Sequence, residues 1–393
     1  MRLLDKYIIS SSVFALFTEA LKFHYIIDWK LFYIIILSNF LLIAINKKIT
    51  IHKNMLVLFL FLLVHGVIGY LFFQNPIKSL IAQFIGIFAS SVYYHNFIKN
   101  YGVKIVFEKY LKFAFIIAVL SLFLFYLNIG LFIPDRLNGI LSEPAHYAAI
   151  MLPAVYVFFK QKEYLKFVII LLTILLSKSS IGYLGLLLML IIPLLQIQHL
   201  LKYSLITLFI IMAGGYYIST KWDDKTDENN NFVIRRIKGT QESLNAAITG
   251  KFTKNINLST YAFMSNVFVT KNIFLEKPFG TGLGSYPFEY DKYYHLIEPP
   301  PYLKTLKLSK INRSDANSLF LRGLSDFGIF WLFLMLFFLY KSVWLFKNNN
   351  TIRQSTFFYL AIKLLREGHY FPPEFYFFLL IFLNKFDEDI AYS

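Results

Sequence analysis

Residues 113–159 read FAFIIAVLSLFLFYLNIGLFIPDRLNGILSEPAHYAAIMLPAVYVFF, which is two apolar runs on either side of a polar segment. Each run approaches the length of about 20 residues that an α-helix needs to cross the hydrocarbon core of a bilayer. The polar segment, Arg136 to Pro144, contains an arginine, a glycine, a glutamate and a proline, which are costly in lipid. We therefore expect this segment to line a polar space at one face of a membrane.

The composition agrees with a membrane protein, since 57% of the residues are hydrophobic and only 16% are charged. Soluble domains have about 25% charged residues. The net charge of +16 could indicate nucleic-acid binding, but Lys and Arg concentrate in the cytoplasmic loops of membrane proteins, so we predict no nucleic-acid partner. The chain has no cysteine, which excludes disulfides, thiolate metal sites and a cysteine nucleophile.

The hydropathy pattern predicts an all-α polytopic membrane protein with about twelve transmembrane helices. The last apolar stretch, 355–384, is interrupted by Arg366-Glu-Gly-His-Tyr-Phe-Pro-Pro, and we interpret it as two short helices joined at Gly368. No small-residue cleavage site follows the first span, which predicts an uncleaved first helix. The other predicted spans cover residues 7–26, 30–45, 55–73, 78–97, 113–133, 145–159, 164–178, 180–196, 203–219 and 323–345.

Loop charges predict the orientation. Clusters of Lys and Arg fall in alternate loops, whereas the short loops opposite hold only Lys78, Arg136 and Lys178. The positive-inside rule then places both termini in the cytoplasm and Arg136 to Pro144 outside. We predict an N-terminal bundle of about nine helices over 1–219, a large outward loop of short helices over 220–322, and C-terminal helices with a short cytoplasmic tail over 323–393.

Two parts of the long loop have readable patterns. Ser259 to Leu275 carries apolar residues at near-helical spacing, which predicts an amphipathic helix at the membrane surface. Phe279-Gly-Thr-Gly-Leu-Gly-Ser-Tyr is rich in glycine but lacks the preceding strand and the Lys-Ser/Thr ending of a phosphate-binding loop. We interpret it as a structural turn.

The polar residues predicted to face outward form a concentrated set. Arginine can bind phosphate with two parallel hydrogen bonds, so several arginines around one cavity would hold a pyrophosphate. The chemistry that suits such a site is displacement of a lipid pyrophosphate from a sugar, with one base for the attacking hydroxyl. The basic candidates are Arg136, Lys178, Arg235, Arg236, Arg313, Arg322 and Arg366, and the acid–base candidates are Glu143, His146, Asp315, Glu367 and His369.

Several of these residues could instead have a purely structural role or be solvated surface charges. Arg235 and Arg236 could be solvated loop charges, and Arg136 could extend from a helix end to the lipid headgroups. Glu143 could simply neutralise Arg136. No His, Asp or Glu cluster has metal-ligand spacing, so we predict neither a bound metal nor a cofactor.

Several short sequence motifs of the chain resemble those of a known protein family. Arg136-Leu-Asn-Gly-Ile-Leu-Ser-Glu-Pro is similar to the R-x-x-G-x-x-x-E-P segment of bacterial O-antigen and capsular polysaccharide polymerases. Three later stretches resemble that family in order and spacing, over roughly residues 110 to 383. They are Leu176-Ser-Lys-Ser-Ser-Ile-Gly-Tyr, then Glu276-Lys-Pro-Phe-Gly-Thr-Gly-Leu-Gly-Ser-Tyr with Asp315-Ala-Asn-Ser-Leu-Phe-Leu, and Arg366-Glu-Gly-His-Tyr-Phe.

The resemblance implies a multi-pass glycosyltransferase of the C-type architecture in the bacterial inner membrane. It would transfer the growing chain from undecaprenyl pyrophosphate to a sugar hydroxyl of the next lipid-linked oligosaccharide, at the periplasmic face. Arg136 and the loop arginines would hold the donor pyrophosphate, with Lys178, His146, Asp315 and Asn317 as further substrate contacts, and Glu143 or His369 would orient or deprotonate the acceptor. The resemblance also implies a separate co-polymerase partner that sets chain length.

Three alternatives stay open. O-antigen ligases, which transfer polymer to lipid A-core, usually carry a histidine near the late-loop asparagine, whereas this chain reads Arg313-Ser-Asp-Ala-Asn without one. That departure favours a polymerase. A flippase or other transporter is expected to show internal repeats and midplane charges, and no half-to-half similarity is visible. The third alternative is a non-catalytic membrane assembly protein.

Overall fold

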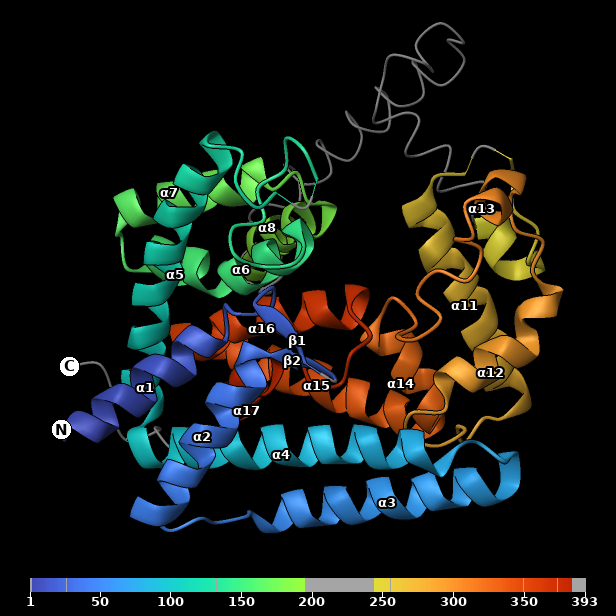
Figure 1. Ribbon diagram of the computed structural model, residues 1–393, viewed down its shortest axis with the longest axis horizontal. Helices are drawn as coiled ribbons and strands as arrows, with labels where there is room; N and C mark the ends of the chain where they lie inside the picture. The colour runs from blue at the N-terminus through green and yellow to red at the C-terminus, as the bar shows by residue number, and fades with distance from the viewer. Residues whose placement is uncertain are drawn as a thin grey trace, which may run out of the picture.

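The computed structural model describes residues 2–25, 27–131, 133–194, 244–254, 256–348, 350–372 and 374–383. These ranges form 16 helices and one two-stranded antiparallel hairpin (Figure 1). The elements are α1 (Leu3–Ala15), β1 (Lys22–Tyr25), β2 (Ile27–Lys30), α2 (Leu31–Asn46), α3 (Lys53–Phe73), α4 (Ile77–Tyr101), α5 (Val103–Tyr126), α6 (Pro144–Lys160), α7 (Tyr164–Leu176), α8 (Ser180–Leu194), α11 (Leu258–Glu276), α12 (Tyr286–Tyr293), the 3-10 helix η1 (Tyr294–Leu296), α13 (Pro301–Thr305), α14 (Leu319–Phe327), α15 (Ile329–Lys347), α16 (Thr351–Arg366) and α17 (Phe375–Leu383).

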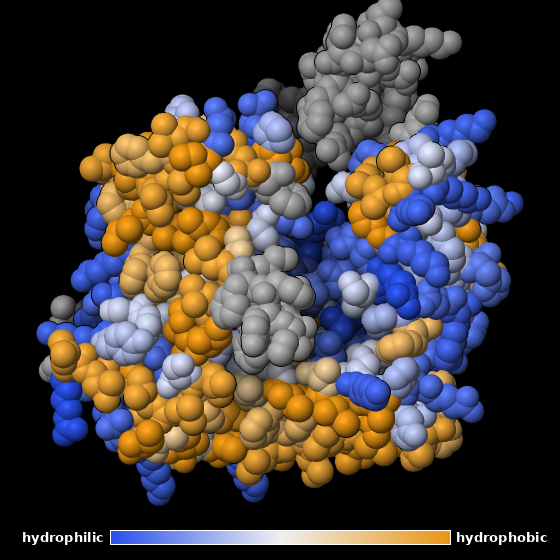
Figure 2. Space-filling model, viewed as in Figure 1, coloured by the Kyte–Doolittle hydropathy of each residue, from blue (hydrophilic) through white to orange (hydrophobic). Residues whose placement is uncertain are grey.

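Four helices of the described residues, α3, α4, α5 and α15, are long and apolar enough to cross a membrane. Helices α2, α7 and α8 are apolar but shorter. Helix α3 leaves large side chains such as Leu60, Leu71 and Phe72 exposed, and orange apolar surface covers wide areas of the molecule in Figure 2. Soluble monomers rarely expose continuous apolar patches of this extent, so the surface indicates a membrane protein.

The centre of the bundle is built from α6 and α16, which pack against each other. Every residue of α6 from Tyr147 to Phe158 is buried, because α7, α8 and α16 surround it. Helix α16 is also largely buried but carries polar side chains inside the bundle, among them Gln354 and Lys363. A buried helix with such residues is unusual in an apolar bundle and points to a polar site.

The described part of the long loop has a separate apolar cluster, which joins α11, α12 and α13 and contains the buried side chains of Tyr261, Phe268 and Tyr286. The helix predicted over 259–275 is confirmed as α11. Its apolar residues Tyr261, Phe268 and Ile273 pack into this cluster, so the prediction that they face a membrane surface is wrong.

Three predicted helix boundaries are wrong. Helix α1 ends at Ala15, and the hairpin follows where the first span was expected to continue to residue 26, because strand-favouring aromatic and β-branched residues alternate there. Helix α5 ends at Tyr126, since Asn128 and Gly130 adopt positive φ angles. The span predicted over 323–345 is divided at Gly328, whose φ is 57°.

Other predictions agree with the structure. The broken last stretch is confirmed as α16 and α17, separated by residues 367–374. The span predicted over 203–219 and the domain boundary at residue 220 lie outside the described residues.

Candidate functional site

The glycine-rich turn at 279–286 binds an anion that belongs to the chain itself. The carboxylate of Asp326 accepts hydrogen bonds from the backbone N–H groups of Gly284 (2.9 Å) and Tyr286 (3.1 Å). The hydroxyl of Ser285 donates to the same carboxylate at 3.1 Å. Gly280, Gly282 and Gly284 all have positive φ, which favours glycine at each position and lets the backbone wrap around the side chain. The prediction of a structural turn is confirmed.

Asp326 also connects this turn to the segment after α16. The hydroxyl of Tyr370 donates to Asp326 Oδ2 at 2.9 Å, and the guanidinium of Arg322 lies 4.5 Å from the centre of the Tyr370 ring. Arg322 donates from Nη1 to the carbonyl oxygen of Gly368 at 2.9 Å and is 2% exposed. Arg322, predicted to bind pyrophosphate, therefore has partners within the protein and fixes the backbone between Glu367 and Tyr370.

A strained turn before α14 packs on the same segment. Ala316 and Asn317 both have positive φ angles, 60° and 58°. A Cβ placed on Gly368 would lie 1.3 Å from the carbonyl oxygen of Asp315, so only glycine allows this contact. The side-chain Nδ2 of Asn317 is buried without a hydrogen-bond partner among the described residues. Strain and an unpaired buried donor together are typical of functional sites.

Buried charges extend from this segment into the bundle. Lys363 of α16 is 2% exposed and forms ion pairs with Glu367 and, at 2.8 Å from Nζ to Oε1, with Glu374. The hydroxyl of Tyr359 donates to the same Oε1 of Glu374 at 2.7 Å. Burial of charged groups without partners is costly, so Lys363 holds both carboxylates in place.

His146, in the first turn of α6, joins this network to the N-terminal part of the chain. Its Nδ1 lies 2.7 Å and 2.8 Å from the two carboxylate oxygens of Glu19, in the turn between α1 and β1. Its Nε2 lies 3.7 Å from Glu367 Oε2. Burial raises the pKa of Glu19, but the hydrogen bond with His146 and the charges of His146 and Lys363 outweigh it and lower that pKa to about 2.

Three further predicted residues lie close to this network. His369 is 59% exposed, and its Nε2 lies 3.7 Å from Asp315 Oδ2. Desolvation by the surrounding protein lowers the pKa of His369, Asp315 opposes this shift, and Arg322, Lys30 and Lys363 add to it. The exposed carboxylate of Glu143 and the carboxylate of Asp315 are near enough to Arg366 to act on its charge.

Arg136 contacts the turn between α7 and α8, which carries Lys178 and lies near the N-terminal end of α6. Arg136 donates from Nε to the carbonyl oxygen of Ser177 at 3.1 Å, and the backbone N–H of Leu137 donates to the carbonyl oxygen of Leu176 at 3.1 Å. The exposed Lys178 follows directly. Two of the four stretches that resemble the polymerases are therefore in contact. Arg235 and Arg236 lie outside the described residues.

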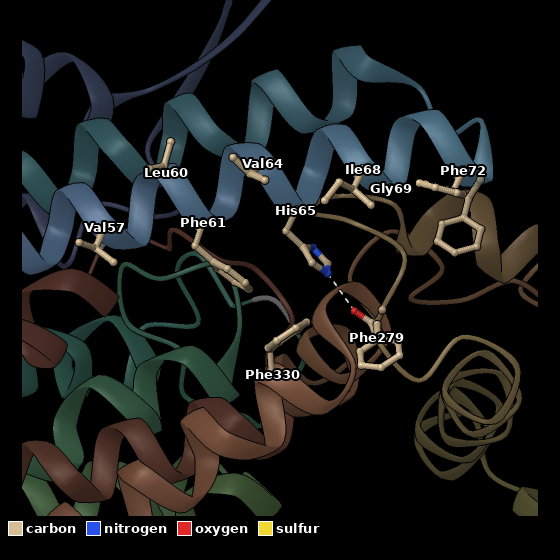
Figure 3. Close-up of a pocket in the computed structure, with 12 residues that line it drawn as sticks. Val57, Leu60, Phe61, Val64, His65, Ile68, Gly69, Phe72, Phe279 and Phe330 are labelled. Atoms are coloured by element: carbon tan, nitrogen blue, oxygen red, sulfur yellow. Dashed lines mark hydrogen bonds between the residues drawn. The ribbon is translucent and has the colours of Figure 1, made fainter.

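Figure 2 shows a hydrophilic hollow between the segment that contains α5–α8 and the segment that contains α11–α13. Beside the glycine-rich turn, an open apolar groove of about 560 Å³ runs along α3, with Phe279 and Phe330 on its other side (Figure 3). One imidazole, that of His65, points into it, with Nε2 2.9 Å from the carbonyl oxygen of Phe279. The molecule thus presents a polar hollow and, on other elements, an apolar groove.

The sequence identified most of these residues but not their partners. Lys363, Glu374, Lys30 and Glu19 were not among the predicted site residues. The sequence signal for these residues was that an ionisable side chain alone in an apolar stretch is costly in lipid. That signal predicts that the side chain has a partner, but it does not identify the partner. Arg313, predicted among the basic candidates, instead pairs with Asp291 at the surface. The described residues contain no group of three or more His, Asp or Glu side chains placed to hold a metal ion.

Comparison with known proteins leaves the resemblance without independent support. No protein-family model matches the chain, and no curated protein sequence matches it significantly. The function is therefore argued from the site.

Proposed function

We propose that this chain is a polysaccharide polymerase of the bacterial inner membrane, with about twelve spans and both termini in the cytoplasm. It extends O-antigen or capsular polysaccharide by glycosyl transfer from a polyprenyl pyrophosphate to a hydroxyl of the next lipid-linked repeat unit. The four long apolar helices are part of that count, and the shorter apolar helices α2, α7 and α8 are further candidates.

One observation carries the proposal: the stretches that resemble the polymerases contact one another although they are far apart in sequence. Arg136 binds Ser177, and His146 lies beside Glu367. The Asp315 backbone packs on Gly368, and the glycine-rich turn reaches Tyr370 through Asp326. Helices that only anchor a protein in the membrane do not require arginines, carboxylates and histidines to gather in one polar region.

The chemistry proposed for this region is electrostatic. Arg136, Lys178 and Arg366 offer positive charge for the pyrophosphate that leaves with its electron pair, and Arg235 and Arg236 of the long loop are the further candidates. A base is also needed, since the acceptor hydroxyl must lose its proton as its oxygen attacks the sugar. Glu143 and His369 are the bases that the resemblance implies.

The test is the surface polysaccharide of a strain that lacks the chain. A polymerase deficiency leaves surface glycolipid with a single repeat unit. Complementation with Arg136→Ala is expected to leave the same single unit, and complementation with Arg2→Ala, an exposed arginine at the start of α1, is expected to restore long chains. Long chains that are unchanged in the deletion strain would contradict the proposal.

The same strain separates the alternative functions. Loss of a ligase leaves polymer on its lipid carrier, whereas loss of a flippase traps single repeat units on the cytoplasmic leaflet. Protease protection and lipid extraction distinguish these outcomes from the single-repeat surface glycolipid expected here.

A further inference from the structure

We propose that His146 is the general base of the transfer reaction and that Glu19 is its positioning residue. This inference rests on the proposed function and assigns the step that deprotonates the acceptor. It departs from the resemblance, which points to Glu143 or His369. The contact between His146 and Glu19 joins residues that are 127 positions apart, which is why it is visible only in the fold.

The geometry at His146 fixes the imidazole in one orientation. Both oxygens of the Glu19 carboxylate are within 2.8 Å of Nδ1, so Nδ1 carries the hydrogen and donates it. When the ring is in its neutral form, the lone pair is then on Nε2, and this is the form that acts as the base. A carboxylate that binds one ring nitrogen and leaves the other basic is the arrangement that activates histidine in hydrolases and in metal sites.

The surroundings of Nε2 favour acceptance of a proton. Glu367 lies 3.7 Å away, and its carboxylate is held by Lys363, which also holds Glu374. The carboxylates of Glu19 and Glu367 lie on either side of the ring, so a proton accepted by Nε2 would have a carboxylate near each ring nitrogen. Glu143, the exposed N-cap residue of α6, lies three positions before His146, and Arg366 lies near it.

His146 also compares well with the two alternative bases. His369 has no hydrogen bond to its nearest carboxylate, since Nε2 and Asp315 Oδ2 are 3.7 Å apart, and its side chain is 59% exposed. Glu143 is exposed and makes no capping hydrogen bond at the start of α6. His146 has a fixed orientation, and its 21% exposed side chain stays accessible to a substrate.

In the proposed step, the acceptor O–H bond breaks and its proton moves to Nε2. The oxygen forms a bond to the anomeric carbon of the donor sugar, and the bond between that carbon and the pyrophosphate oxygen breaks. The electron pair leaves with the lipid pyrophosphate, and the imidazolium later returns the proton to water. No oxidant or metal is required.

The experiment uses lipid-linked repeat units extracted from the deletion strain, with full-length protein purified in detergent. Polyprenyl pyrophosphate release and polymer length are measured from pH 5 to 9. His146→Ala is expected to lower kcat by about 100- to 10,000-fold. Glu19→Gln keeps the shape of the side chain but removes its charge, so it is expected to lower kcat less and to move the acidic limb of kcat/KM to lower pH.

Two control variants separate catalysis from folding. His295→Ala removes an exposed histidine of η1, and Glu163→Gln removes a partly exposed carboxylate that pairs with Lys166. Both are expected to keep wild-type activity and pH dependence. Thermal unfolding identifies any variant that fails to fold. If His146→Ala does not fold, the proposal is tested with Glu19→Gln, whose side chain has nearly the same shape as that of wild type.

The possible failures are distinct. If the wild-type protein releases no polyprenyl pyrophosphate and makes no polymer, the proposed function is wrong. If wild type is active and His146→Ala retains that activity, the assignment of the base is wrong. A Glu19→Gln variant that loses activity with an unshifted acidic limb would show that Glu19 only ties the α1–β1 turn to α6, and this also overturns the inference.

Discussion

Removal of the Asp326 carboxylate is expected to destabilise the junction between the glycine-rich turn and the segment after α16. In Asp326→Ala, the backbone N–H groups of Gly284 and Tyr286 lose their acceptor, and each unpaired buried donor costs about 1–3 kcal/mol. The hydroxyl of Tyr370 loses its partner, and Arg322, at 4.0 Å, loses the nearest negative charge. We therefore expect a loss of about 4 kcal/mol or more.

The measurement is thermal unfolding of the purified protein in detergent. For large chains, a change of 1 kcal/mol moves Tm by roughly 2 °C, so Asp326→Ala is expected to lower Tm by about 8 °C. The matched control is Asp291→Asn, because Asp291 pairs with Lys310 and Arg313 at the surface and such pairs contribute about 0–1 kcal/mol. If the two variants unfold within about 2 °C of each other, the interpretation of Asp326 as an internal anchor is refuted.

Three further perturbations follow from the site. Gly368→Ala should abolish polymer formation in complemented cells, because its Cβ would overlap the carbonyl oxygen of Asp315; a variant with normal chain length would contradict this. Lys363→Met leaves two buried carboxylates without their cation and should lower stability by about 3–5 kcal/mol, which denaturant unfolding can measure. Glu19 has a pKa of about 2 in the fold against 4.5 normally, so the stability from its ionisation is full above about pH 4.5 and is lost as the pH falls towards 2. The difference in Tm between wild type and Glu19→Gln should therefore shrink on acidification from pH 6 to pH 3, and a constant difference would argue against this role.

Much of the fold is encoded in local sequence signals. The apolar runs of α3 and α15 and the break at residues 367–374 are visible in hydropathy and in the Gly and Pro positions. The hairpin after α1 was missed because averaging over a long window merges its aromatic residues with the preceding apolar helix. The division at Gly328 was missed for a similar reason, since one glycine hardly changes the mean hydropathy of a long span.

The site was predictable in composition but not in its pairings. His146, His369 and Glu367 were identified one by one, because each is costly beside lipid, whereas Glu19 and Glu374 were not. Which carboxylate holds which histidine depends on how the turn after α1 meets the first turn of α6, and a single sequence contains no signal for that. Arg322 illustrates the same limit, since its charge predicted a ligand and its buried position gives it internal partners instead.

The polar character of α16 has a consequence for how the chain enters a membrane. A segment with Gln354, Ser355, Thr356 and Lys363 on its buried side is a poor candidate for insertion into lipid by itself. Its binding surface is α6, which is synthesised nearly two hundred residues earlier and is already available when α16 emerges from the ribosome. We therefore expect α16 to take its place in the bundle through its contacts with α6 rather than through its own hydrophobicity.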